Sequence, residues 1–464
     1  MNRKEFLRLA GLAPMSFLMD APSFLHDLAQ NPDVLFFRKG TEAYEKLRKG
    51  FNKRIDKYPA IIAKCFTEKG VIEAVKKAKK EGLPVAIKSG GHCMEGFSIN
   101  QEGMAINLSE LKKIEWLDDR TVQVGPACTL SELYDALLPK GVIIPGGSCA
   151  GVAIGGLALG GGYGLLSRSL GLTCDSLIGL RMVNGKGDCI DTNSDPILLK
   201  ACKGGNSGNF GVVTSLRFRV HDAPKYMQSF KFRSYAVTTQ RAFILFENWF
   251  KQSAALPNHC FSAFVLNRKT AYILLVNTGK QTEAVNAFIQ SCKSVSDKST
   301  QSIKQPLPQA LKNYYGRREP LYFKNASAGL YQGFNDIKDK LPSVIEKVGK
   351  SNGMIFQINT LGGKVKDEGF ANSSVFPHRN LLFFSELQVY WDRPSQQETG
   401  LKAFQEVQML INPKGDMPQY RNYPDLRFKN APSVYYGENH VFLQTMKTKY
   451  DSENLFRYEQ SIKA

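Results

Sequence analysis

Two nucleophilic side chains in this sequence stand on glycine-rich segments. His92 ends Ser89-Gly90-Gly91-His92, and Cys149 follows Gly146-Gly147-Ser148. Glycine has no Cβ, so both segments let the backbone approach a flat ligand or a phosphate closely. Imidazole and thiolate are the side chains best suited to attack an electrophilic ring. The pair predicts a planar cofactor that is bonded to the protein twice, and flavin is the ligand that fits both bonds.

Four stretches of the chain carry a family resemblance. They run from Ile87 to Ser98, from Gly146 to Leu177, from Gly204 to Val220 and from Tyr435 to Ile462. Together they resemble the flavin domain of the berberine bridge enzyme-like and gluco-oligosaccharide oxidase-like proteins, within the vanillyl-alcohol oxidase superfamily. The resemblance implies that His92 carries the flavin 8α-methyl group and that Cys149 forms a thioether at ring position C6.

The same resemblance implies a PCMH-type FAD-binding domain in which many further residues contact the cofactor. Most are glycines or short side chains in the resembling stretches. Besides His92 and Cys149, the expected contacts are Lys88, Ser89, Gly90, Gly91, Gly96, Phe97, Ser98, Gly147, Ser148, Val152, Gly155, Gly156, Gly160, Gly162, Tyr163, Gly164, Asp175, Gly208, Asn209, Gly211, Val213 and Asn439. Val152 matches a family position where a small side chain leaves oxygen a path to the ring, which favours an oxidase over a dehydrogenase.

A second interpretation of the glycine run Gly155–Gly164 is a nicotinamide-binding Rossmann loop. Such a loop follows a strand directly and needs an acidic residue about 20 positions later, at the end of the next strand. Asp175 instead falls in a loop-like segment, Gly171–Ser176. We therefore predict a close-approach loop that, with Ser89–His92, holds FAD through backbone N–H groups. Plain glycine turns are the alternative.

A tyrosine-rich segment, Tyr420-Arg421-Asn422-Tyr423-Pro424-Asp425, is similar to the family's YxNYxD motif, whose tyrosines face the substrate. Oxidation of an alcohol by hydride transfer needs a side chain that removes the hydroxyl proton. Tyrosine can serve when nearby positive charge or hydrogen bonds lower its pKa from the ordinary value of ~10. We predict Tyr423 as the base with Tyr420 beside it. For either tyrosine alone, a half-buried aromatic role is the alternative.

Alternating side chains in two further segments predict a substrate surface. Strand alternation sends Glu386, Gln388 and Tyr390 to one face, and Gln357 and Asn359 are likewise two residues apart. A polar and aromatic face suits sugar hydroxyls, whereas an ordinary exposed sheet face is the alternative.

The chain departs from the family pattern in the predicted site. Cys93-Met94 replaces a common Ser-Tyr pair, which removes a hydroxyl and a stacking ring from the substrate side. Ala150 replaces a proline after the linking cysteine. Lys88 replaces an arginine, which keeps the charge but loses the fork geometry.

Local patterns predict the elements that position the two attachment residues. Apolar spacing from Thr67 to Glu81 predicts a helix with a Thr67 cap, followed by a buried strand Leu83–Ile87 that leads to His92. Residues 114–124 alternate about a polar turn, as in a β-hairpin. Thr129–Glu132 has capping-box spacing and opens a helix before the extended run that leads to Cys149.

Beyond His221 the glycine density drops and strands alternate with helices. Ser262–Leu266 and Ala271–Val276 flank a polar turn, and Thr282–Cys292 has helical spacing. We expect an α+β fold, with a two-subdomain PCMH-type FAD-binding domain and an α+β substrate domain whose antiparallel sheet is backed by helices. The expected divisions are an N-terminal segment 1–35, the FAD-binding domain 36–220, the substrate domain 221–424, and a segment 425–464 that returns to the FAD-binding domain.

Composition excludes several classes of function. The 464 residues carry a formal net charge of +19, but the positive residues are dispersed, which argues against nucleic-acid binding. Nine cysteines without CxxC spacing and six histidines without HxxxH or HExxH spacing indicate neither a disulfide framework nor a metal site. We expect no metal, no stable membrane insertion and no obligate protein partner.

The N-terminal residues Asn2–Gly11 resemble a degenerate twin-arginine export signal, with Arg3-Lys4 in place of two arginines. Pro14 interrupts the apolar run that follows, and Asp20-Ala21-Pro22 is a poor cleavage site, so a plain amphipathic helix is the alternative. The resulting expectation is a periplasmic protein if the signal works, and otherwise a cytoplasmic one.

These observations predict a bicovalent FAD oxidase that oxidises the hydroxyl of a sugar, an oligosaccharide or a related small alcohol and reduces O2 to H2O2. A dehydrogenase or a ring-closing oxidase of a secondary metabolite is the enzymatic alternative. A flavin-binding sensor without turnover is the alternative from another class.

Overall fold

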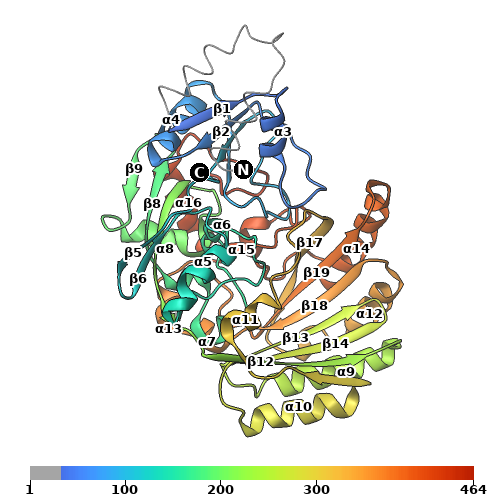
Figure 1. The fold of residues 1–464 in the computed structure, drawn as a ribbon. Helices are drawn as coiled ribbons and strands as arrows, with labels where there is room; N and C mark the ends of the chain where they lie inside the picture. The colour runs from blue at the N-terminus through green and yellow to red at the C-terminus, as the bar shows by residue number, and fades with distance from the viewer. Residues whose placement is uncertain (1–32) are drawn as a thin grey trace.

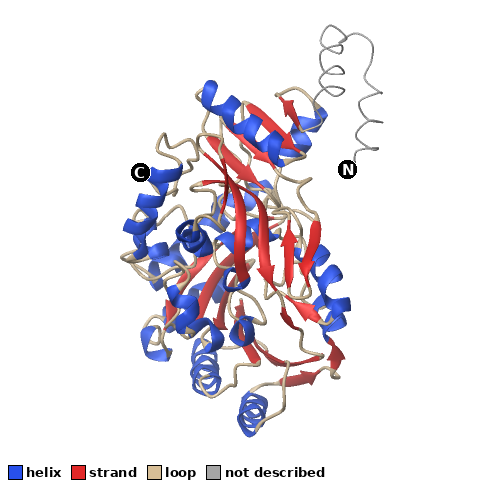
Figure 2. Cartoon of the chain, turned by 90° about the vertical axis from the view of Figure 1, so that its left-hand side faces the viewer, coloured by secondary structure: helices blue, strands red, loops and turns tan. Residues whose placement is uncertain are grey.

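The computed structural model describes residues 33–464, so the predicted export signal lies outside the described residues. Two small sheets and their helices form one half of the molecule, and one large sheet forms the other (Figure 1). Seen from the side, strands run through the middle of the molecule and helices lie outside them (Figure 2).

The first small sheet has the strand order β1-β2-β4-β3, with β2, β4 and β3 parallel and β1 antiparallel to β2. Thr67 caps α4, whose apolar face packs on this sheet, and β3 then leads directly to Ser89–His92. The elements are β1 (Val34–Phe37), α3 (Glu42–Arg48), β2 (Ile61–Cys65), α4 (Glu68–Lys80), β3 (Val85–Lys88) and β4 (Met104–Asn107).

The second small sheet has the order β5-β6-β10-β8-β9 and is antiparallel throughout. Thr129 and Glu132 form the predicted capping box at the start of α5. The strands are β5 (Ile114–Asp118), β6 (Thr121–Val124), β8 (Leu177–Asn184), β9 (Cys189–Asp191) and β10 (Gly211–Arg219); a further short strand, β7 (Val142–Ile143), pairs with β11 (His221–Asp222). The helices are α5 (Leu130–Leu137), α6 (Ile154–Leu159), α7 (Ser167–Leu170) and α8 (Pro196–Gly205), with 3-10 turns η2 (Leu138–Lys140) and η3 (Thr173–Ser176).

The large antiparallel sheet has the order β15-β12-β14-β13-β18-β19-β17, and β16 pairs with β12. Its strands are β12 (Tyr226–Ser234), β13 (Cys260–Asn267), β14 (Thr270–Asn277), β15 (Lys298–Gln301), β16 (Gln305–Pro306), β17 (Tyr322–Tyr331), β18 (Met354–Thr360) and β19 (Phe383–Trp391). Helices α9 (Thr239–Ser253), α10 (Glu283–Val295), α12 (Leu341–Lys350) and α14 (Gln397–Ile411) cover its outer face (Figure 1). Shorter elements complete this half: α11 (Leu307–Lys312), α13 (Glu368–Asn372), η4 (Phe334–Asp336), η5 (Gly363–Lys366) and η6 (Pro394–Gln396).

Alternation along these strands divides the large sheet into two different faces. Phe264, Ile273 and Phe356 point to the helical layer and form an aromatic and aliphatic core with it. The opposite face turns toward the small sheets, where Phe261 and Val265 join the core of the first half. That inner face is therefore the surface that can close a site between the two halves.

The C-terminal segment returns to the first half of the molecule. Helices α15 (Ala431–Tyr436) and α16 (Asn439–Tyr450) pack beside α8, and Phe456 forms a parallel bridge with Val85 of β3. The Lys447 ammonium is buried and bonded to Asp451, Asn209 and Phe456, which fixes the end of the chain.

The predicted helix behind Thr67, the hairpin β5–β6 and the pair β13–β14 are all confirmed. The glycine run differs from the prediction of a loop, because Ile154–Leu159 forms the short helix α6 and a loop begins only at Gly160. Gly155 allows this helix to lie against Pro126, since a Cβ on it would come within 2.8 Å of the Pro126 oxygen.

Candidate active site

The loops that carry His92 and Cys149 are in direct contact. A Cβ on Gly90 would lie 2.8 Å from the Cβ of Ala153, and a Cβ on Gly151 would lie 3.4 Å from the His92 ring. Gly91 adopts a φ of +69°, which favours glycine, at the tightest point of the first loop. The absence of side chains at these positions is thus what allows the two predicted attachment residues to share one site.

His92 is held in a fixed orientation. Its ring stacks on Phe51 with 4.5 Å between ring centroids, and its Nδ1 lies 3.1 Å from the Gly90 oxygen. Burial lowers the pKa of His92, and the Gly90 carbonyl opposes that shift only in part. The imidazole is therefore neutral at neutral pH and keeps the nitrogen lone pair that a nucleophile needs.

Cys149 remains solvent-accessible, with its Sγ facing Gly316. Desolvation raises the pKa of the Cys149 thiol, and the negative charge of Glu386 raises it further, whereas a hydrogen bond with Ser148 lowers it. The thiol is consequently protonated at neutral pH, and the effect of Glu386 shows that the large sheet faces this loop.

The loop Ser89–His92 offers donors for an anion. Its four consecutive backbone N–H groups donate no hydrogen bond to any residue from 33 to 464. Buried or half-buried amides are ordinarily paired, so a run of four free ones indicates a ligand with acceptor oxygens. These donors fit the pyrophosphate of FAD.

The glycines expected to contact the cofactor separate into two groups. Gly156 has open space where its Cβ would be, with Ser89 Oγ 4.0 Å away, and a Cβ on Gly147 or Gly208 would meet nothing nearer than 3.6 Å. A Cβ on any of the others would come within 2.9 Å of a neighbouring group, so these glycines serve contacts within the protein: Gly90, Gly91, Gly96, Gly155, Gly160, Gly162, Gly164 and Gly211. Gly147, Gly156 and Gly208 are therefore the positions of this set with room on the Cβ side for a cofactor.

Four other residues expected to bind FAD have side chains that bond within the protein. Lys88 donates to the Leu47 and Lys49 carbonyls, and burial lowers its pKa to about 8. Asp175 forms a buried bidentate ion pair with Arg379. The Asn209 side chain bonds to Gly205, Tyr458 and Ile462, and the Asn439 side chain bonds to Val375. These bonds give the four residues a structural role, and their contact with FAD stays a prediction.

The remaining expected contacts lie around the same loops. Phe97 stacks on Tyr458 of the C-terminal segment with 4.8 Å between ring centroids. The Val152 carbonyl accepts from Leu130 N at 2.9 Å, and its side chain is half-buried. Ser98 is half-exposed and Val213 is buried on β10.

Tyr420 and Tyr423 are packed edge to face with ring centroids 5.1 Å apart, but their hydroxyl groups differ. Tyr420 Oη accepts hydrogen bonds at 3.0 Å from Gly162 N, Tyr163 N and Asn422 Nδ2. Burial raises the pKa of Tyr420 to about 12, although the hydrogen bonds from these donors lower it in part. Tyr423 Oη, in contrast, has no hydrogen-bond partner among residues 33–464. Tyr420 thus fixes the segment, and Tyr423 presents a free hydroxyl.

The predicted polar face is assembled on β17, β18 and β19. Glu386 lies opposite Gln357 in the sheet register and accepts from Asn359 Nδ2 at 3.4 Å and from Asn325 Nδ2 at 3.3 Å. Tyr390 Oη donates to Gln388 at 2.8 Å. Burial raises the pKa of Glu386 while the two asparagine amides lower it. The sequence-predicted polar residues are therefore brought together, and Asn325 is an addition that sequence analysis missed because it lies on a different strand.

Glu386 and Tyr423 also affect each other. Burial raises the pKa of Tyr423 well above its ordinary value, and the charge of Glu386 is the next largest cause, followed by Tyr420 and Cys149. Tyr163 belongs to the same group: its hydroxyl donates to the Thr360 oxygen at 2.6 Å, and Glu386 and Tyr420 raise its pKa beyond the effect of burial. The tyrosines, Glu386 and Cys149 therefore share one site.

A row of buried charges, missed by sequence analysis, joins the parts of the site. Glu95, three residues after His92, pairs with Arg54 at 2.8 Å and with Lys324 of β17. Lys324 also pairs with Asp425 at 2.9 Å. The four charges alternate in sign. Glu95 in the His92 loop and Asp425 at the end of the YxNYxD segment are the two members of the row that the sequence motifs contain.

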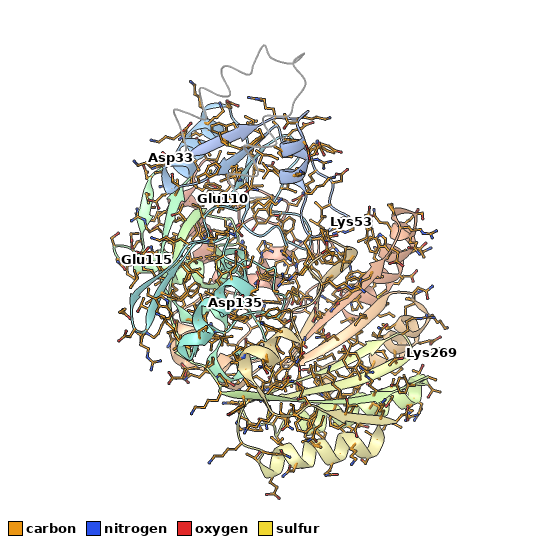
Figure 3. All side chains as sticks on the ribbon, viewed as in Figure 1. Asp33, Lys53, Glu110, Glu115, Asp135 and Lys269 are labelled. Atoms are coloured by element: carbon orange, nitrogen blue, oxygen red, sulfur yellow. The ribbon has the colours of Figure 1, made fainter. Side chains whose placement is uncertain are left out.

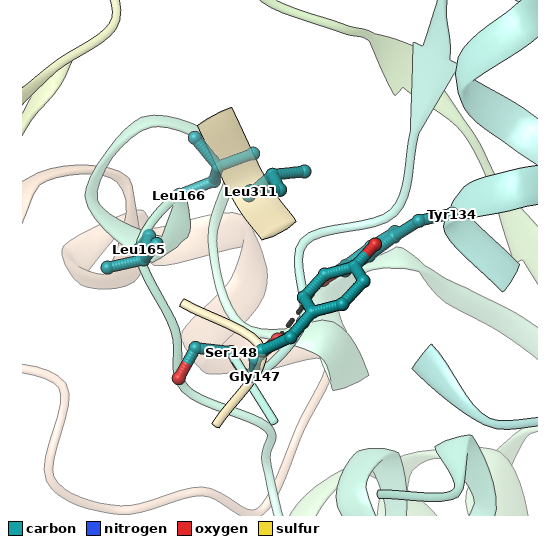
Figure 4. Close-up of a pocket in the computed structure, with 8 residues that line it drawn as sticks. Tyr134, Gly147, Ser148, Leu165, Leu166 and Leu311 are labelled. Carbon is teal, nitrogen blue, oxygen red and sulfur yellow. Dashed lines mark hydrogen bonds between the residues drawn. The ribbon is translucent and has the colours of Figure 1, made fainter. Parts of the chain in front are cut away.

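A small cavity lies under the Cys149 loop (Figure 4). It has a volume of about 10 Å³, room for about one water molecule, and is lined by Tyr134, Gly146, Gly147, Ser148, Leu165, Leu166, Leu311 and Tyr315. The Tyr134 hydroxyl donates to the Gly147 oxygen at 3.3 Å across it. Residues 33–464 contain no cluster of three or more potential metal ligands and no helix long and apolar enough to cross a bilayer.

Free loop amides, two nucleophiles in contacting loops and a group of buried and half-buried tyrosines indicate a flavin-binding oxidoreductase. Comparison with known proteins agrees. The FAD binding domain family matches residues 59–193, and the family described as "Berberine and berberine like" matches residues 419–463. The chain is an FAD-linked oxidoreductase, and it is similar to the berberine bridge enzyme-like proteins in both matched segments.

Individual relatives span nearly the whole chain. The FAD-linked oxidoreductase YgaK of Bacillus subtilis is 29% identical over 90% of this chain and 94% of its own length. The chitooligosaccharide oxidase of Gibberella zeae is 26% identical, covering 92% of this chain and 91% of that protein. The structure of Physcomitrella patens BBE-like 1 superposes with a TM-score of 0.84 at 25% identity, covering 95% of this chain and 98% of that one. This likeness confirms the predicted α+β fold class.

Proposed function

We propose that the protein is a bicovalently flavinylated oxidase in which His92 and Cys149 each bond to FAD. The observation that carries this proposal is the contact between their loops, where Gly151, two residues after Cys149, lies against the His92 ring. A neutral imidazole and an accessible thiol in one site match the two nucleophiles that a doubly attached flavin needs. The free amides of Ser89–His92 would hold its pyrophosphate.

The substrate we propose is the hydroxyl of a sugar, an oligosaccharide or a related small alcohol. The inner face of the large sheet presents amide, carboxyl and phenol groups from Gln357, Asn359, Glu386, Gln388 and Tyr390, which can bind several hydroxyl groups at once. Relatives named as carbohydrate and chitooligosaccharide oxidases support this class. The small side chain of Val152 favours O2 as the electron acceptor.

When bound, FAD supplies the acceptor for the substrate hydride and passes the electrons to O2, which forms H2O2. Tyr423 Oη takes the hydroxyl proton, because it is the phenol in this site without a partner. A neutral phenol must give up its own proton to do so. The two groups are not hydrogen-bonded to each other, so the Glu386 carboxylate, whose charge raises the pKa of Tyr423, would accept that proton through one water molecule.

The test of attachment is the mass of the purified, folded protein expressed with ample flavin. The wild type should carry the mass of one FAD after denaturation, each of His92→Ala and Cys149→Ala should retain it through the other bond, and the double variant should lose it. Cys93→Ala and His440→Ala are matched controls that should not change attachment. Wild-type protein without added mass would refute the covalent proposal.

The test of activity is anaerobic reduction of the flavin by a panel of neutral and acidic saccharides and simple alcohols, followed by H2O2 measurement in air. Reduction with stoichiometric H2O2 supports the oxidase. Reduction that reoxidises only with an artificial acceptor would indicate the dehydrogenase alternative. A flavin that stays oxidised with every substrate would indicate a sensor without turnover.

A further inference from the structure

A segment after α11, Tyr314–Leu321, covers both predicted attachment residues; we call it the rim segment. On the Cys149 side, Ala150 N donates to the Tyr315 oxygen at 3.0 Å, and a Cβ on Gly316 would lie 3.6 Å from Cys149 Sγ. The rim segment thus lies against the thiol and against its loop.

At its other end, the rim segment forms backbone hydrogen bonds with Phe51 and Lys53, which lie near the His92 loop. Lys53 N donates to the Leu321 oxygen at 2.8 Å, and Leu321 N donates to the Phe51 oxygen at 3.1 Å. Phe51 is the residue that stacks on His92. The rim segment is therefore joined to the loops of both predicted attachment residues.

The rim segment and its neighbours carry positive charge. Arg317 and Arg318 are exposed and form no ion pair with any residue from 33 to 464. Lys312 and Lys53 are exposed beside them, and Figure 3 shows Lys53 where the first half of the molecule meets the large sheet. The segment also contains one acidic residue, Glu319, which is exposed as well.

The positive charge of Arg317 affects the pKa of a tyrosine on the polar face. Burial, Glu386 and Cys149 raise the pKa of the Tyr390 phenol, and the Arg317 guanidinium lowers it. The guanidinium is therefore near the tyrosine that lies two residues beyond Gln388.

We propose that the preferred substrate is an acidic saccharide whose carboxylate binds Arg317 and Arg318 while its reacting hydroxyl lies on the polar face. Guanidinium groups bind carboxylates through two parallel hydrogen bonds, and two exposed guanidinium groups without ion-pair partners also attract anions from solution. This inference rests on the proposed function, because it names the substrate class of the same site.

The experiment compares cellotriose with the trisaccharide in which the primary hydroxyls are oxidised to glucuronate, so that the two differ by their carboxylates. Stopped-flow flavin reduction gives kcat/KM for each with the holoenzyme. We expect the acidic trisaccharide to be favoured at least about tenfold at low ionic strength, with the preference falling as NaCl is added. In Arg317→Ala/Arg318→Ala the ratio of the two kcat/KM values should fall about tenfold, and Arg317→Lys should retain part of it.

Lys251→Ala, an exposed basic residue on the outer helix α9, is the matched control and should leave the ratio unchanged. Equal or better turnover of cellotriose by the wild type, or an unchanged ratio in the arginine variant, would overturn the inference while leaving the proposed function intact. If neither sugar reduces the flavin, calorimetric binding of the acidic trisaccharide decides: loss of binding in the arginine variant keeps anion recognition, and no binding to the wild type ends it. The proposed function fails only if the whole panel of saccharides and alcohols leaves the flavin oxidised.

Discussion

Glu95 and Lys324 form a buried ion pair between the loop that follows His92 and the strand β17 of the large sheet. Arg54 on one side and Asp425 on the other extend the pair, so that the cofactor loop, the substrate sheet and the tyrosine segment share one row of charges. Because Asp425 lies two residues after Tyr423, this row sets the position of the proposed base relative to His92.

Removal of one charge from the row should destabilise the protein. In Glu95→Gln, Arg54 loses its carboxylate partner and Lys324 keeps only Asp425, so we expect a loss of about 3 kcal/mol in the free energy of unfolding. Urea unfolding followed by tryptophan fluorescence measures it. Glu115→Gln, whose partner Lys113 is exposed, is the control and should change stability by less than about 0.5 kcal/mol. An equal effect of both substitutions would contradict the structural role of the row.

The two tyrosines of the YxNYxD segment should respond differently to loss of their hydroxyl groups. Tyr423→Phe should slow flavin reduction by about 10²-fold or more with little change in stability, because its hydroxyl has no partner to lose. Tyr420→Phe leaves three N–H donors without an acceptor and should lower the thermal midpoint. Stopped-flow reduction and thermal unfolding of both variants distinguish the roles; a faster-reacting Tyr423→Phe than Tyr420→Phe would reverse the assignment.

Gly156 should show opposite effects on the protein and on its cofactor. Alanine fits the open space at this helical position and has a higher helix propensity, so Gly156→Ala should stabilise the protein without flavin by up to about 1 kcal/mol. The added methyl group faces the space expected for FAD and should reduce flavin incorporation. Gly90→Ala is the comparison, since its Cβ would collide with Ala153 and should destabilise the protein with or without flavin. Full flavin loading of Gly156→Ala would show that this glycine does not contact the cofactor.

Formation of the bond to Cys149 should depend on pH. The pKa of this thiol is raised, so the thiolate is scarce at neutral pH and becomes more abundant as the pH rises toward the raised value. Reconstitution of flavin-free protein should therefore give thioether faster at pH 9 than at pH 7, as followed by mass after denaturation. Glu386→Gln removes a negative charge that raises this pKa and should shift the profile to lower pH. A rate that falls with rising pH would contradict a thiolate mechanism.

The local elements could be predicted from the sequence where a residue pattern is satisfied by neighbouring residues. Thr67 caps a helix, Thr129 and Glu132 form a reciprocal cap, and polar turns join apolar strands, because each pattern is satisfied within a few residues. It also placed Glu386, Gln388 and Tyr390 in one group, since alternation in a strand is a local rule.

Long-range partners could not be predicted. The side chains of Lys88, Asp175 and Asn209, which are expected at the cofactor, also bond to Leu47, Arg379 and Tyr458. No local pattern encodes a partner that lies some 40 to 250 residues away. The same limit explains why the ion pair of Glu95 and Lys324 could not be predicted, because 229 residues separate the two side chains in the sequence.

The bridge between Phe456 and Val85 has a consequence for the time at which the cofactor can be attached. The strand that leads to His92 gains this neighbour from a residue more than 350 positions further along the chain. A ribosome must therefore translate past Phe456 before that strand is complete. Flavin loading should accordingly wait for this segment, and a nascent chain stalled before residue 450 should remain colourless.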